Sequence, residues 1–311
     1  MYASAAPPVP DDVVRVEGAS GIVPPANRQA GCPPDEQNDT LHIVPDTVPR
    51  TEDYPLDGPL LRALWQMEDG HFWHRARNRW ILRALERRGV KPAASFLEIG
   101  CGAGAVTRTL HKAGYTVTGV DPAEVLVRKA AERCPTVRFV VADVAALDAS
   151  TYGPFEGIGY FDVLEHLDDP AGLLTGSLRL AAPNALVIAT VPARRSLGTV
   201  IDDLSGHKRR YEPDELGALL QRCGLVDIEE QGIFRLTAPL QRWSRRRLAE
   251  HTLDALSPAE AERTFLRNFR VPPWPINAAM DLLCRLEATV GPPTQAGATL
   301  LATGRWPASG P

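Results

Sequence analysis

A glycine-rich turn is the segment of the sequence with the clearest chemical potential. Gly100, Gly102 and Gly104 follow the apolar run 95–100 and precede an expected helix over 105–112. Glycine permits backbone conformations with positive φ and lets a ligand approach the main chain closely. The start of a helix also presents free N–H groups. The turn therefore predicts a nucleotide-binding loop.

The kind of nucleotide depends on the acids beside this loop. Together with Ala105, the glycines match a dinucleotide fingerprint, and Asp121 lies about 20 residues further on, as that fingerprint requires. Glu98, however, lies in the strand just before the loop, where its carboxylate would repel a pyrophosphate. A carboxylate can instead organise the amino and carboxyl ends of a zwitterion, directly or through water. The sequence favours the zwitterion, and the dinucleotide is the alternative.

A sheet must hold the loop and these acids, and the hydrophobic pattern predicts one. Apolar runs alternate with helical segments, which indicates an α/β fold, a doubly wound Rossmann-like sheet, mostly parallel, with helices on both faces. Seven strands are expected, over 95–100, 115–120, 137–142, 157–162, 185–191, 226–234 and 298–303. Asp121 and Asp143 follow two of them, at the edge where such sheets bind ligands.

Other segments flank this core. The expected order is a disordered Pro-rich arm (1–55), an N-terminal helical cap (56–92), the core (93–235), a helical insertion (236–296) and the last core strand with the tail (297–311). The arm holds ten prolines and little hydrophobic periodicity. Helical spacing predicts two cap helices, over 57–69 and 71–88. The insertion is far longer than an ordinary loop.

Composition excludes several classes of protein. The 311 residues carry 34 Lys and Arg against 38 Asp and Glu, a balance that argues against a nucleic-acid partner. The five cysteines form no Cys-x-x-Cys pair and the seven histidines no His-Glu-x-x-His pattern, so no metal site is predicted. The cysteine usage fits a reducing compartment. No apolar run is long enough for a membrane span and no secretory signal is recognised, so a cytoplasmic protein is expected.

Together the motifs resemble class I S-adenosylmethionine-dependent methyltransferases of the small-molecule, ubiquinone-biosynthesis-like kind. Glu98-x-Gly100-x-Gly102-x-Gly104 is similar to the first motif of that family. The segment 162–166, with the sequence Asp-Val-Leu-Glu-His, resembles its D-x-x-E-H motif. The resemblance covers roughly 95–235 and the last strand, and the order and spacing of the motifs agree as well.

This resemblance implies S-adenosylmethionine as the cofactor and assigns residues to it. Glu98 and the three glycines would hold its amino acid end. Asp121 would hold the ribose hydroxyls, and Asp143 with Val144 would contact the adenine. Asp162 completes the expected cofactor site. Both strand-end acids, Asp121 and Asp143, have helix N-capping as an alternative role.

Methyl transfer needs in-line positioning in a dry pocket, and an acidic acceptor adds the need for a general base. His166 follows the fourth expected strand and is the first catalytic candidate, since the pKa of histidine lies near the working pH. His207 is the second. The alternatives are that His166 only packs beside the cofactor and that His207 belongs to a solvated basic loop.

The resemblance also implies a small-molecule acceptor, methylated at oxygen rather than at nitrogen or carbon. Trp73, Arg77 and Tyr211 are the expected substrate-binding residues, with the cap and the insertion closing over the acceptor as a lid. Core packing of Trp73 is the alternative. A monomer or homodimer is expected. An NAD-dependent oxidoreductase and a catalytically silent S-adenosylmethionine-binding module are the competing functions.

Overall fold

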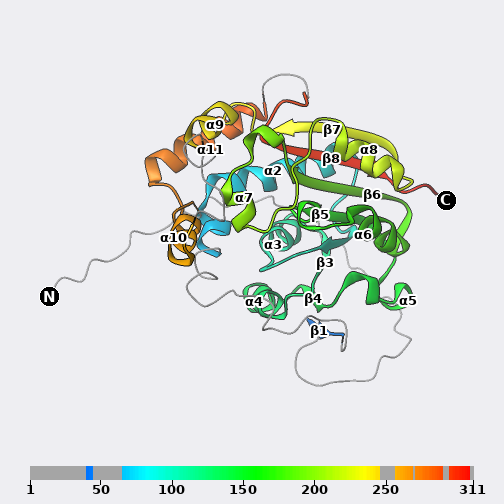
Figure 1. The fold of residues 1–311 in the computed structure, drawn as a ribbon. Coiled ribbons are helices and arrows are strands. Elements are labelled where there is room, and N and C mark those ends of the chain that lie inside the picture. The colour runs from blue at the N-terminus through cyan, green and yellow to red at the C-terminus, as the bar shows by residue number, and fades with distance from the viewer. Residues whose placement is uncertain (1–39, 45–64, 246–255, 269, 290–293, 309–311) are drawn as a thin grey trace, which may run out of the picture. The chain divides into compact units, whose positions relative to one another are not determined.

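The computed structural model describes residues 40–44, 65–245, 256–268, 270–289 and 294–308. Its centre is a mixed sheet of eight strands in the order β1-β4-β3-β2-β5-β6-β8-β7 (Figure 1). The strands are β1 Leu41–Ile43, β2 Ser95–Ile99, β3 Thr116–Asp121, β4 Arg138–Val141, β5 Phe155–Phe161, β6 Ala181–Pro192, β7 Val226–Ile233 and β8 Thr299–Arg305. β1 to β6 pair in parallel, whereas β8 runs antiparallel between β6 and β7.

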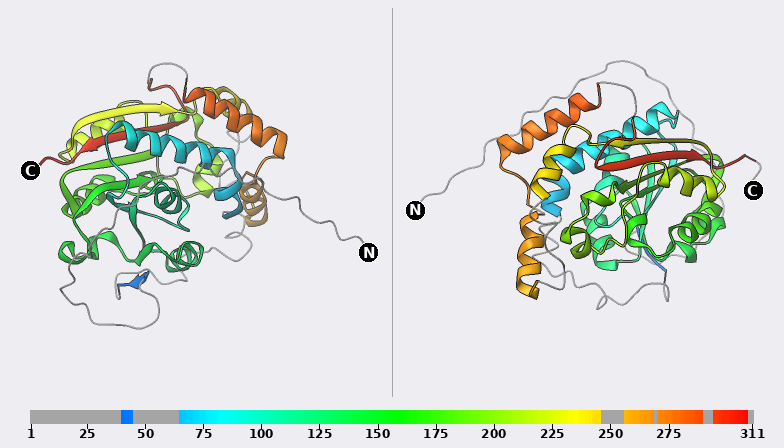
Figure 2. Two further views of the ribbon diagram at one scale, coloured as in Figure 1. Left: turned by 180° about the vertical axis from the view of Figure 1, so that it is seen from behind. Right: turned by 45° about the horizontal axis from the view of Figure 1, so that its top comes forward.

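Helices cover both faces of the sheet (Figure 2). They are α2 Phe72–Arg87, α3 Ala105–Lys112, α4 Glu124–Arg133, α5 Ala149–Tyr152, α6 Pro170–Ser177, α7 Val200–Leu204, α8 Glu215–Arg222, α9 Ala238–Arg245, α10 Pro258–Asn268 and α11 Trp274–Glu287. The apolar sides of α2, α3 and α4 pack on one face, and those of α6 and α8 pack on the other. None of the helices in the described ranges is long and apolar enough to cross a membrane.

The sheet has one strand more than the sequence predicts. Residues 41–43, within the segment expected to be a disordered arm, pair in parallel with β4, where Leu41 lies opposite Phe139 and Ile43 opposite Val141. The expectation of seven strands, and of an arm without structure at this point, is therefore wrong. Three residues show no readable periodicity, and their hydrogen-bond partners lie far away along the chain. The remainder of the arm, 1–39 and 45–55, is outside the described residues.

The cap and the insertion contain helices where the sequence predicts them. Residues 65–70 are helical, and α2 begins two residues later; 57–64 lie outside the described part of the chain. In the insertion, α9, α10 and α11 separate β7 from β8. α11 runs beside α2 (Figure 2), so the two added segments contact each other.

One buried amide joins these two helices. The side-chain oxygen of Asn277 accepts a hydrogen bond from the backbone N–H of Phe72 at 2.9 Å, and its nitrogen donates to the carbonyl oxygen of Gly70 at 2.8 Å. Phe72 is the first residue of α2, so its N–H has no partner within that helix. Asn277, a residue of the insertion, therefore caps the N-terminus of α2.

We expect Asn277→Ala to lower the free energy of unfolding by about 1–3 kcal/mol, because it leaves a buried N–H and a carbonyl unpaired. Urea unfolding of the ligand-free chain measures the change. Asn268→Ala is the matched control, since within the described part of the chain this exposed amide donates one hydrogen bond, to the carbonyl oxygen of Thr264 in its own helix. Equal stability losses in both variants would contradict the capping role.

Candidate functional site

The carboxyl ends of four neighbouring parallel strands meet at one edge of the sheet, as in other open α/β sheets that bind ligands there. Gly100 follows β2, Asp121 ends β3, Asp143 lies just beyond β4 and Asp162 follows β5. β2 pairs with both β3 and β5, and β3 pairs with β4. The structure thus brings the residues that the sequence assigns to the cofactor to a single edge.

The glycine loop has the backbone that the sequence predicts. The φ angles of Gly100, Gly102 and Gly104 are +72°, +51° and +78°. A Cβ added at Gly100 would lie 2.5 Å from Val163 Cγ2, and one at Gly104 would lie 2.9 Å from the Cβ of Ala130. A Cβ at Gly102 would meet no described atom within 4 Å. The outer glycines are therefore needed for packing, whereas Gly102 presents its backbone to open space.

Asp121 holds this loop in place. Its carboxylate accepts hydrogen bonds from the N–H of Gly102 at 2.9 Å and from the N–H of Ala123 at 2.8 Å. Burial raises the pKa of Asp121, and both hydrogen bonds oppose that shift because they stabilise the ionised form. The acid therefore links the loop after β2 to the turn after β3, in addition to any contact with a ligand.

Glu98 is a buried acid directly beneath the loop. Only 2% of it is exposed, and its carboxylate accepts a hydrogen bond from the Thr107 hydroxyl on α3. Burial raises the pKa of Glu98 to about 8, because desolvation disfavours the charged form more strongly than Thr107 and the nearby Arg77 favour it. At neutral pH this carboxyl is mostly protonated until a positive charge is placed near it.

Asp143 and Val144 lie at the far side of the same edge. Asp143 is exposed, and its Oδ1 accepts a hydrogen bond from the N–H of Ala145 at 2.9 Å. This is the capping role that the sequence leaves open as an alternative. Val144 is buried. Contact of this pair with an adenine stays a prediction.

Arg77 reaches the edge from α2. Its buried guanidinium forms an ion pair with Asp162, whose other oxygen accepts a hydrogen bond from the Thr190 hydroxyl at 3.2 Å. The guanidinium also lies 5.1 Å from the ring centroid of Trp73, which stacks on Phe234 at 5.4 Å. Trp73 therefore packs between the core and Arg77, in agreement with the core alternative. Their contact with an acceptor remains a prediction.

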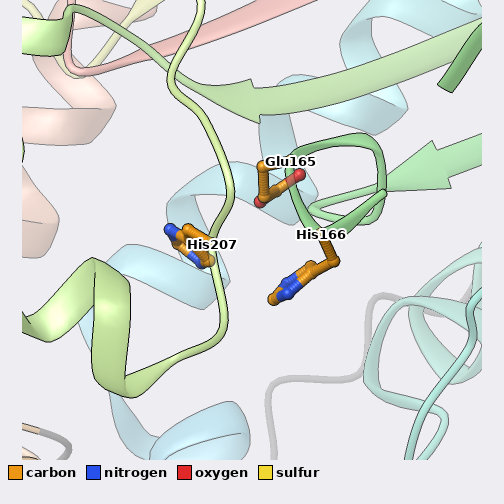
Figure 3. Close-up of side chains that lie close together, drawn as sticks. All are labelled: Glu165, His166 and His207. Carbon is orange, nitrogen blue, oxygen red and sulfur yellow. The ribbon is translucent and has the colours of Figure 1, made fainter. Parts of the chain in front are cut away.

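Two histidines that are distant in sequence come together beside a buried acid (Figure 3). The rings of His166 and His207 lie 4.9 Å apart, and one ligand atom from each of Glu165, His166 and His207 lies within 4.8 Å of the others. His166 Nδ1 is 3.2 Å from the Gly206 carbonyl oxygen. Burial lowers the pKa of His166, with the neighbouring His207 adding to the shift. The two residues predicted as catalytic candidates therefore lie next to each other.

Tyr211 supports the turn that carries His166. It is buried, and its hydroxyl donates a hydrogen bond to the carbonyl oxygen of Leu164 at 3.2 Å. The backbone N–H of Lys208 also donates to the carbonyl oxygen of Glu165, at 2.8 Å. The segment around His207 therefore holds the turn that carries His166. Contact of Tyr211 with a substrate stays a prediction.

Sequence reasoning missed two residues of this group. Glu165 stands within the D-x-x-E-H motif, and that motif was the available signal for it. Asp202 accepts a hydrogen bond from His207 Nδ1 at 3.1 Å. It lies on the short helix α7, which the hydrophobic pattern does not predict, so no local signal marks it.

A family model described as a methyltransferase domain matches residues 71–256, more than half of the chain. The chain belongs to this methyltransferase family. The membership confirms the resemblance that the sequence motifs carry, and S-adenosylmethionine is the cofactor that this family uses.

Several curated relatives of this methyltransferase are named ubiquinone biosynthesis O-methyltransferase. The one from Caulobacter sp. (strain K31) is 31% identical over 168 residues, covering 48% of this chain and 66% of the relative. The one from Methylococcus capsulatus is 36% identical over 95 residues, covering 29% and 40%. In the one from Xanthomonas axonopodis pv. citri, 27% identity extends over 211 residues, covering 60% and 84%. The match thus spans less than two thirds of the first two relatives.

Solved structures support the fold of the methyltransferase. Phosphoethanolamine N-methyltransferase 2 of Haemonchus contortus, in complex with S-adenosyl-L-methionine, superposes with a TM-score of 0.52 at 18% identity, covering 80% of this chain and 57% of that one. The [4+2]-cyclase SpnF superposes with the same TM-score at 20% identity, covering 84% and 98%. At these identities the similarity concerns the fold alone.

Proposed function

We propose that the chain transfers a methyl group from S-adenosylmethionine to a hydroxyl oxygen of a small-molecule acceptor. The observation that carries the proposal is the buried carboxyl of Glu98 beneath a loop whose central glycine, Gly102, faces open space. This combination can take up a nucleotide with a positively charged amino group. The O-methyltransferase names of the relatives support oxygen as the methylated atom. Family membership argues against the NAD-dependent alternative.

The residues present fit the cofactor. Glu98 would bind its amino group, and the N–H groups of the glycine loop, held by Asp121, would bind its carboxylate. Asp143 and Val144 would border its adenine. Asp162, which Arg77 holds in place, lies beside the loop. When bound, S-adenosylmethionine supplies a methyl group on a positively charged sulfur, which an oxygen nucleophile can accept.

His166 and His207 are the groups that can act on the acceptor. A hydroxyl acceptor must lose its proton as the new O–C bond forms and the S–C bond breaks, so a basic group must lie nearby. His166 lies on the turn after β5, and Val163 of the same turn packs against Gly100 of the glycine loop. His207 lies beside His166, so both imidazoles are close to the loop. This pair favours an acidic hydroxyl as the acceptor.

A cytoplasmic location and a monomeric or homodimeric state remain predictions.

Calorimetry with S-adenosylmethionine and an assay for S-adenosylhomocysteine formation test the proposal. Catechol serves as the probe acceptor, since its hydroxyls are acidic. We expect binding of one cofactor per chain, and product formation that requires both cofactor and catechol. Binding without any transfer to catechol, other phenols or amines would favour the catalytically silent module. Binding of NAD instead would favour the oxidoreductase.

Asp121→Ala should weaken S-adenosylmethionine binding by about 1.5–3 kcal/mol, because the loop loses its hydrogen bond at Gly102 and the ribose loses a charged partner. Calorimetry measures the loss. Asp148→Ala is the control, since this exposed acid also accepts a backbone hydrogen bond, from Ser150 at 3.1 Å, but lies at the start of α5. Wild-type affinity in the Asp121 variant would remove this residue from the cofactor site.

A further inference from the structure

Arg133 on α4 joins two segments that are distant in sequence. Its guanidinium donates a hydrogen bond to the carbonyl oxygen of Ala103 in the glycine loop at 3.2 Å. The same guanidinium pairs with the carboxylates of Glu68 at 3.0 Å and Asp69 at 2.7 Å. Both acids belong to the helical residues 65–70, which form the cap turn. One side chain thus connects the cap turn to the loop that we propose as the cofactor loop.

Two further contacts hold the cap turn on the same surface. Asp69 also accepts a hydrogen bond from Arg108 on α3. The ammonium group of Lys129 lies 4.9 Å from the centroid of the Trp65 ring. Lys129 precedes Arg133 by about one helical turn, so both side chains leave the same face of α4. The cap turn is therefore docked on α3 and α4 through three cationic side chains.

These contacts differ from ordinary surface ion pairs because they are partly buried. Only 16% of the Arg133 side chain and 21% of the Glu68 side chain is exposed. Burial raises the pKa of Glu68, and the hydrogen bond and the charge of Arg133 oppose that shift. An isolated exposed ion pair contributes little, whereas a planar guanidinium that bonds several oxygens in one network fixes their geometry. The network can therefore position the segments that it joins.

The loop end of this network lies where a ligand would bind. The N–H of Ala103 makes no hydrogen bond within the described part of the chain, so it is available to an anionic group such as a carboxylate. The peptide planes on either side of this residue share its Cα atom, so a carbonyl held by Arg133 restricts the direction of that N–H. Burial raises the pKa of Glu98, and the charge of Glu68 adds to this shift, which places the cap turn close to the acid beneath the loop.

We propose that Arg133 is a positioning residue of the cofactor loop, which it holds in the binding conformation only while the cap turn is docked. The inference rests on the proposed binding of S-adenosylmethionine at this loop. Because one guanidinium bonds both segments, the order of each favours the order of the other. Binding of the cofactor and docking of the cap turn must then strengthen each other by the same factor.

Hydrogen exchange of the ligand-free chain tests the link between the two segments. One variant is Arg133→Met, which keeps an unbranched side chain and removes the guanidinium. The other is the double variant Glu68→Ala/Asp69→Ala, which leaves Arg133 in place. We expect faster exchange of the amides of residues 101–105 in both variants, although the double variant alters no residue of the loop.

Calorimetry with S-adenosylmethionine gives the second measurement. We expect both variants to bind at least ~10-fold more weakly than the wild-type chain, still with one cofactor per chain. A purely structural defect would instead lower the number of binding sites, because unfolded chains do not bind. Arg128→Met is the matched control, since this guanidinium lies on the same helix and pairs with Glu124 of that helix at 2.7 Å. It should keep the exchange rates and the affinity of the wild-type chain.

The two measurements fail separately. Wild-type exchange of 101–105 in the cap-turn variant would overturn the link, because Arg133 would then hold the loop without the cap turn. Wild-type affinity in Arg133→Met would overturn the positioning role. If the wild-type chain itself bound no S-adenosylmethionine, the proposed function would fail, and the exchange rates would still decide whether the cap turn holds the loop.

Discussion

Gly102→Ala is expected to bind S-adenosylmethionine at least ~100-fold more weakly than the wild-type chain, a loss of roughly 2.7 kcal/mol or more, while keeping its fold. The new methyl group would meet no described protein atom within 4 Å, so no steric contact opposes it. It would instead occupy the space where a ligand must approach the backbone. Calorimetry measures the affinity, and thermal unfolding measures the stability.

A residue with the same backbone strain serves as the control. Gly89 has a φ of +73°, and a Cβ there would also meet no described atom within 4 Å. It follows α2, away from the carboxyl edge. Alanine in the left-handed region costs about 1–2 kcal/mol at either position. Both variants should therefore lose similar stability, but only Gly102→Ala should lose affinity. Equal affinity in the two variants would mean that Gly102 does not line the cofactor site.

The core strands could be predicted because each carries its own signal. β2 and β3 are apolar runs next to turn residues, and the loop between β2 and α3 has a motif of its own. β1 could not be predicted, since three residues of a proline-rich segment become a strand only by pairing with Phe139 and its neighbours in β4. Tertiary contacts therefore decide the edge of the sheet, and local pattern decides its centre.

The residues of the candidate site also fall into two groups: those that a local sequence pattern identifies and those that only tertiary contacts bring together. The residues of the proposed cofactor site could be identified in the sequence, because Glu98 and the glycines lie around one turn and Asp121 ends the next strand along the chain. The proposed acceptor side could be predicted only in part. His166 and His207 were each identified, but their proximity depends on how the loop that carries His207 folds back toward the end of β5. The hydrogen bond from the Tyr211 hydroxyl to the carbonyl oxygen of Leu164 is a contact that no sequence spacing reveals.

Affinity for S-adenosylmethionine is expected to fall about 10-fold for each pH unit below 8, reaching ~100-fold at pH 6. Burial raises the pKa of Glu98 in the ligand-free chain to about 8. A bound ammonium group favours the ionised carboxylate and lowers that pKa. Binding below pH 8 must therefore release the Glu98 proton, and this release becomes less favourable as the pH falls.

The released proton can be counted. At pH 7 a group with a pKa near 8 is ~90% protonated, so binding should release close to one proton, which calorimetry in buffers of different ionisation enthalpy detects. The amino group of the ligand also titrates near pH 8, but it takes up a proton on binding, a small effect of opposite sign. Glu98→Gln keeps this ligand titration and removes only the protein's proton, so the difference between the two chains isolates Glu98. If the wild-type chain and Glu98→Gln release the same number of protons, Glu98 does not bind the ammonium group, and the zwitterion must be held elsewhere on the loop.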